Sequence, residues 1–157
     1  MTNELQLLIE ALEKKERILR QILDKSKIQL NVAEAETLDV ERFDKLVDDK
    51  ASLLEEMVKL DEGFDSTYQR VKDELLTQKD RYKKEIVVLQ KLIENGVDLG
   101  AQISAAETRT KNKLSVSLAR SKKELVQKRV STKVASDYYK TSNNFKHASS
   151  FFLDKKK

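Results

Sequence analysis

The chain has 157 residues, of which 37% are charged and 39% hydrophobic, with three Gly and no Pro, Cys or Trp. This composition is typical of coiled coils and excludes a disulfide framework and cysteine-based zinc sites. So few turn-forming residues leave few loops on which to build an active site, and His147 is the only histidine. We therefore expect an all-α protein that is not an enzyme, with no catalytic residue, cofactor or metal.

The net charge of +4 is unevenly distributed along the chain. From Thr110 onward, thirteen Lys or Arg stand against three acidic residues, whereas residues 1–109 hold eighteen basic and twenty-four acidic residues. The two parts favour different partners and attract each other. The N-terminus lacks the basic region of a signal peptide, and no apolar run is long enough to span a membrane. We expect a cytoplasmic protein.

The first predicted helix covers residues 3–35, with Thr2 or Asn3 as its N-cap. Small or apolar residues recur along it at the three-and-four spacing of a helical seam. They are Leu5, Leu8, Leu12, Leu19, Ile22, Ser26 and Leu30, with Lys15 as the one polar gap. The seam ends near residue 34, and we expect a turn over residues 34–39.

The second predicted helix covers residues 40–76 and has Asp39 as a suitable N-cap. Its seam alternates strictly between spacings of three and four, as in a left-handed coiled coil. The positions are Val40, Phe43, Val47, Lys50, Leu54, Met57, Asp61, Phe64, Tyr68, Val71 and Leu75. Polar residues within a seam, here Lys50 and Asp61, more often fix register than perform chemistry. Leu46, Leu53 and Leu60 widen the seam, which indicates two helical partners.

The third predicted helix starts at Asp80 and runs to about Tyr139, with residues 80–110 inside the bundle. The seam continues through Tyr82, Ile86, Leu89, Ile93, Gly96, Gly100 and Ile103. Short turns make successive helices antiparallel neighbours. We therefore expect residues 1–110 to form an elongated antiparallel helical hairpin with the first half of a long third helix beside it. The rest of the third helix extends beyond the hairpin.

Residues 111–140 form a basic C-terminal extension, and residues 141–157 are expected to be a mobile tail. Within the extension the apolar residues follow a period of four, which drifts around a helix and does not hold one coiled-coil partner for long. An exposed stripe of this kind is suited to a helical partner. The predicted partner-binding residues are Leu114, Leu118, Leu125, Val126, Val130, Val134, Tyr138, Tyr139, Phe151 and Phe152.

Several stretches resemble the FlgN-like flagellar export chaperones: the helix entry at residues 38–43, the run 50–60, Glu107 and Asn112 within residues 103–114, and the ending Phe-Phe-Leu-Asp-Lys-Lys-Lys. The resemblance implies a chaperone without ATPase activity that binds hook–filament junction (hook-associated) proteins in the cytoplasm. Such a chaperone keeps their terminal helices from self-associating and delivers them to the flagellar type III export apparatus. Cargo contact would fall on residues 114–139.

Three other functions remain open. Two basic extensions can pair, which would make a structural coiled-coil oligomer. The extension can also neutralise phosphates while Tyr138, Tyr139 and Phe145 stack on bases of a nucleic acid. Arginine, which suits specific phosphate contacts, is scarce there. Binding to an anionic membrane surface is physically allowed, although the apolar face is thin.

Overall fold

The computed structural model describes residues 2–121, with the side chains of residues 3–117. Over these residues the chain forms three α-helices: α1 (Thr2–Glu34), α2 (Val40–Thr77) and α3 (Lys83–Ser121). No strand occurs in residues 2–121, so the all-α prediction is confirmed. Most of the predicted extension and all of the predicted tail lie outside the described residues.

The helix boundaries follow local capping chemistry. The Asp39 carboxylate caps α2, because its Oδ1 accepts a hydrogen bond of 3.1 Å from the Arg42 backbone N–H. The prediction that Asp80 begins the third helix was wrong by three residues. The Arg81 and Tyr82 amides donate to the carbonyls of Gln78 and Lys79, which are tight-turn bonds, and the first helical bond runs from Ile86 N–H to the Tyr82 carbonyl.

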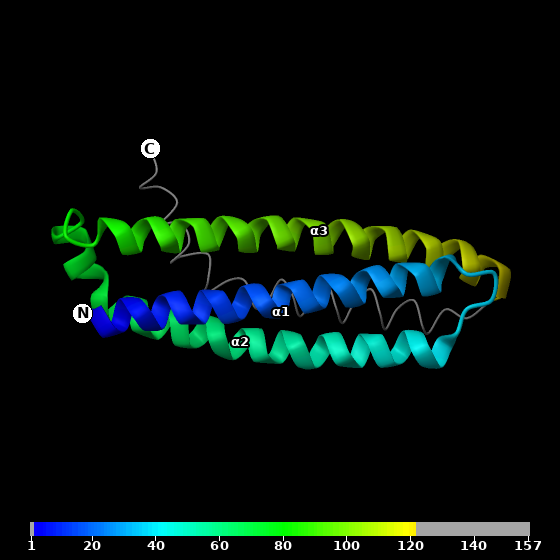
Figure 1. Cartoon of the computed structure of the whole chain (residues 1–157). Coiled ribbons are helices and arrows are strands. Elements are labelled where there is room, and N and C mark those ends of the chain that lie inside the picture. The colour runs from blue at the N-terminus through cyan, green and yellow to red at the C-terminus, as the bar shows by residue number, and fades with distance from the viewer. Residues whose placement is uncertain (1, 122–157) are drawn as a thin grey trace.

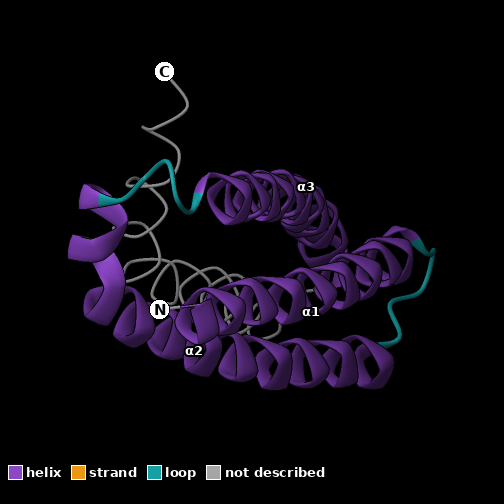
Figure 2. Ribbon diagram, turned by 60° about the vertical axis from the view of Figure 1, so that its left-hand side comes forward, coloured by secondary structure: helices purple, strands orange, loops and turns teal. Residues whose placement is uncertain are grey.

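The three helices are long, and α1 lies between the other two (Figure 1). It packs against both α2 and α3, whereas the backbones of α2 and α3 do not come close to each other. The α1–α2 pair is antiparallel, as expected from the short turn. The five residues 78–82 carry the chain across the end of the hairpin, so α3 lies beside α1 and parallel to it, not against α2 (Figures 1 and 2).

Among the described side chains, the core consists of three apolar clusters along the bundle. One joins the N-terminal half of α1 to the C-terminal half of α2 and the start of α3, around Leu8, Phe64 and Leu89. A central cluster includes Ile22 and Leu99, and a third, around Phe43, closes the other end. Each fully buried leucine or phenylalanine contributes on the order of 2 kcal/mol through burial.

The predicted seams are confirmed at nearly every position. One seam residue of α1 was wrong: Leu30 is only half-buried, and the buried residue in that turn is Gln29. The spacing from Ser26 is therefore three residues and not four. Because the seam of α1 faces two helices, its centre is fixed by both of them and not by the most apolar residue in each turn.

Gly63 lies inside α2 on an exposed surface, and a Cβ placed there would have no other atom within 4 Å. Glycine in a helix interior is less favourable than alanine by roughly 0.5–1 kcal/mol. We predict that Gly63→Ala raises the free energy of unfolding by about that amount in urea denaturation. Gly63→Ser should give about half the gain, and a loss of stability in both variants would contradict an unstrained helix at this site.

Candidate functional site

The structure places only one predicted partner-binding residue with its side chain. Leu114 is fully buried and belongs to the terminal cluster with Val32, Ala33, Phe43, Leu46 and Val47. Its prediction as a partner-binding residue is corrected, because this side chain completes the bundle's own core. Leu118 is part of α3, but its side chain is not described. The other eight residues, from Leu125 to Phe152, lie outside the described residues.

Two polar positions that interrupted the predicted seams face each other. Lys15 of α1 donates to Asp61 Oδ1 of α2 at 2.8 Å, and both side chains are almost fully buried. Burial lowers the pKa of Lys15 and raises the pKa of Asp61, while their mutual attraction acts in the opposite direction on each. The sequence marked both residues as polar gaps, but only the packing of α1 on α2 shows that they are partners.

A second polar layer joins all three helices. Lys50 Nζ of α2 donates to Glu107 Oε1 of α3 and to Ser26 Oγ of α1 at 3.3 Å. The Ser26 hydroxyl in turn donates to Glu107 Oε1 at 3.0 Å. Burial lowers the pKa of Lys50, opposed by the nearby Glu107 carboxylate. Glu107, which carried part of the family resemblance, therefore has a structural role within the bundle.

Polar character continues one level further toward the α1–α2 turn. Gln29 and Thr110 each follow a member of this layer by three residues on the parallel helices α1 and α3. The Thr110 hydroxyl donates to the Ala106 carbonyl at 2.9 Å. The Gln29 side chain is fully buried, and neither of its amide atoms has a hydrogen-bond partner. An unsatisfied buried amide costs about 1–3 kcal/mol, so this level of the bundle is less stable than the apolar clusters.

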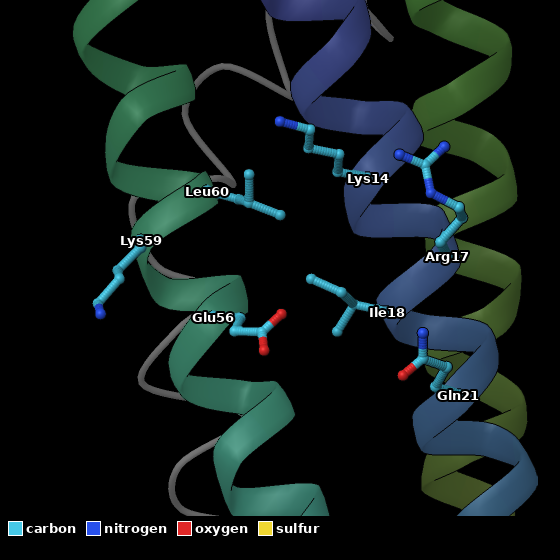
Figure 3. A pocket seen from close by; sticks show the side chains of 7 residues that line it. All are labelled: Lys14, Arg17, Ile18, Gln21, Glu56, Lys59 and Leu60. Carbon is cyan, nitrogen blue, oxygen red and sulfur yellow. The ribbon is translucent and has the colours of Figure 1, made fainter.

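A surface pocket of about 470 Å³ lies between α1 and α2. Ile18 and Leu60 point toward each other across it, and Lys14 and Arg17 lie along its α1 side (Figure 3). Gln21, Glu56 and Lys59 complete the lining. An aliphatic floor with three cations and one carboxylate suits an aliphatic side chain that is accompanied by an anionic group. One signal in the sequence pointed to this surface, since Leu60 belongs to the leucines that widen the α2 seam.

The described residues hold no feature that specifies a reaction. No group of three or more His, Asp or Glu side chains is placed to bind a metal ion between residues 2 and 121. None of the helices in that range is long and apolar enough to cross a membrane. Comparison with protein-family models, curated proteins and solved structures found no match.

Substitution of Leu114 tests how far the core extends along α3. We predict that Leu114→Ala lowers the free energy of unfolding by about 2–5 kcal/mol, because it removes a fully buried side chain from a packed cluster. Val116 is on the same helix turn and is 56% exposed, so Val116→Ala should change stability by less than about 0.5 kcal/mol. Equal, small effects of the two substitutions in urea denaturation would show that the core ends before Leu114.

The buried Lys15–Asp61 pair gives a second prediction. Lys15→Met alone should cost about 3–5 kcal/mol, because it leaves the Asp61 carboxylate buried without its cation. The double variant Lys15→Met, Asp61→Leu should be as stable as the original chain or up to about 4 kcal/mol more stable. Failure of the second substitution to restore stability would contradict a specific pairing of the two groups.

The advantage of that double variant should depend on pH. The raised Asp61 pKa adds stability to the original chain as pH falls through the folded-state value toward the unfolded one, near 3.8. The lowered Lys15 pKa adds stability as pH rises from the folded-state value toward 10.5. The difference in unfolding free energy between the two proteins should therefore be largest near neutral pH and shrink at pH 4.5 and pH 10. A difference that is constant with pH would contradict this.

Proposed function

We propose that this protein is a cytoplasmic export chaperone with the role of the FlgN-like proteins. It binds the amphipathic terminal helices of flagellar hook–filament junction proteins and delivers them to the flagellar type III export apparatus. The observation that carries the proposal is the apolar stripe of Val126, Val130, Val134 and Tyr138, which follows the completed bundle core. Partner helices are commonly bound by apolar residues at such helical spacings.

The bundle supports the proposal through the position of its last core cluster. Leu114 lies in a cluster with Val32 and Ala33 near the end of α1 and with Phe43 near the start of α2. The hairpin therefore has no further length with which to cover α3 beyond this cluster. In the proposed function, an export substrate's amphipathic helix is the surface that covers apolar residues later in the chain.

The pocket between α1 and α2 offers a second place for contact with a partner. Its Ile18 and Leu60 floor accepts an aliphatic side chain, and Lys14, Arg17 and Lys59 attract acidic groups beside it. An amphipathic helix with acidic residues next to its apolar face has both features. In the proposed function, the pocket contributes to recognition, and the stripe provides most of the apolar contact.

Substitutions in the stripe test the proposal directly. Val130→Asp with Val134→Asp should weaken binding of a synthetic terminal-helix peptide from a hook–filament junction protein of the same genome by at least about tenfold, because it puts two carboxylates into an apolar contact. Fluorescence anisotropy of the labelled peptide with the full chain measures this. Ser131→Asp with Thr132→Asp makes the same change in net charge away from the stripe and should keep most of the affinity.

Other outcomes would favour the alternative functions. No binding of the peptide by the original chain, together with a concentration-dependent dimer in light scattering, would favour a structural coiled-coil oligomer. Capture of a nucleic acid with an affinity that falls steeply with salt would favour phosphate neutralisation by the basic segment. Equal loss of peptide binding in the two double variants would assign the interaction to charge and not to the stripe.

A further inference from the structure

The three described helices occupy three corners of a four-helix bundle. In such a bundle each helix packs against two neighbours, and the two helices on a diagonal remain apart. Here α1 has both neighbours, while α2 and α3 have no close backbone approach to each other (Figure 2). At the corner between α2 and α3, opposite α1, each of the two helices therefore has a flank that no other described helix covers.

The flank of α2 that borders this corner is acidic. The opposite flank of α2 faces α1, because Asp49 pairs with Lys25 of α1 at 3.5 Å and Leu60 meets Ile18 of α1 at the pocket. Residues seven apart share a face of a coiled-coil helix, which places five carboxylates on the flank away from α1. They are Asp44, Asp48, Glu55, Glu62 and Asp65.

The middle of the α3 flank that borders the corner, from Val97 to Thr108, has small side chains. Leu92 and Leu99 lie on the opposite flank and belong to clusters that contain residues of α1. The flank away from α1 carries Ala101, Ser104 and Thr108, all exposed, and Val97, which is 55% exposed. Small residues allow a further helix to approach closely, while the α2 side of the corner attracts positive charge.

We propose that residues 122–157 of this chain occupy the corner between α2 and α3 and complete the bundle. This segment holds ten Lys or Arg against three acidic residues, a net charge of +7, while α2 holds six basic and eleven acidic residues, a net charge of −5. The segment follows Ser121, the last residue of α3, which lies at the end of the bundle where α2 begins (Figure 1). Its 36 residues span about 54 Å as a helix, close to the length of α2.

One consequence of this placement rests on the proposed function, because it concerns how a partner helix reaches the stripe. The stripe at Val126, Val130, Val134 and Tyr138 faces the bundle when the segment is docked, so a partner helix must compete with an internal contact. The segment then protects its own apolar residues until an export substrate is present. The docking itself is a property of the free chain and is tested without any partner.

Thiol cross-linking of the full chain tests the docking, because the natural sequence contains no cysteine. Val130→Cys is combined in turn with Ala51→Cys and with Val58→Cys on the acidic flank of α2. As a control it is combined with Gln21→Cys, which lies on α1 at the pocket, away from the corner between α2 and α3. A short bis-maleimide reagent is applied at low protein concentration. We expect intramolecular cross-links to Ala51→Cys or Val58→Cys to form at least tenfold faster than to Gln21→Cys. Equal rates, or products that are mainly dimers, would overturn the proposal.

Charge reversal separates docking on the acidic flank from general collapse of the segment. Glu55→Lys with Glu62→Lys should slow the fast cross-link at least fivefold. The matched pair Glu10→Lys with Glu13→Lys on exposed positions of α1 makes the same change in net charge and should leave the rate nearly unchanged. An unaffected rate in the α2 variant would overturn the role of the acidic flank.

The terminal-helix peptide described above should slow the same cross-link as its concentration rises. Fast cross-linking without any effect of the peptide would contradict the proposed function while leaving the docking intact.

Discussion

The register of the bundle depends on charged side chains that are buried between helices. Lys15 meets Asp61, and Lys50 meets Glu107 and Ser26. A shift of α2 along α1 by one heptad would keep most apolar contacts but would place Lys15 against Leu54 or Tyr68. A buried charge without its partner costs about 3–5 kcal/mol, so slipped registers are excluded more strongly than leucine contacts alone would exclude them.

These polar layers also divide the bundle into parts of different character. The end around Leu8, Phe64 and Leu89 is held by apolar contacts of all three helices. Toward the α1–α2 turn, the centre of the bundle contains the Lys50 layer and then Gln29, whose amide has no partner. The position of α3 is thus set by apolar burial at its start and by specific polar contacts near Glu107, where a loss of any one partner leaves others unsatisfied.

Much of the fold could be predicted from periodicity and capping. The strict alternation in α2 predicted its buried face, and Asp39 predicted its start. The arrangement of the helices could not be predicted in the same way, because seams of long helices are alike and do not specify which neighbour they face. The pairing of Lys15 with Asp61 joins two gaps on different helices, and only the register of those helices brings them together. Hydrophobicity favours Leu30 as the next seam residue after Ser26, whereas the alternation of spacings of three and four selects Gln29, which is the buried one.

The candidate site was less predictable than the fold. The spacing predicts Leu114 as a partner-binding residue at the start of the stripe, but Leu114 belongs to the core, since the helices of the hairpin reach as far as this residue. The period of four could not reveal this, because Leu114 has the same spacing to Leu118 as the later residues have to one another. The pocket at Ile18 and Leu60 was indicated only by an excess of leucine on α2. Its shape depends on how α1 packs against α2, which the sequence does not specify.

The parallel contact of α1 with α3 determines the order in which the chain can fold during synthesis. The first two helices are adjacent in sequence and can form their hairpin early, since local contacts form fastest. Ser26, however, receives its partner Glu107 from 81 positions later in the chain. The part of α1 around Ser26 must therefore stay uncovered on its α3 side until Glu107 has emerged from the ribosome, so the growing chain passes through a stage with an exposed helix face.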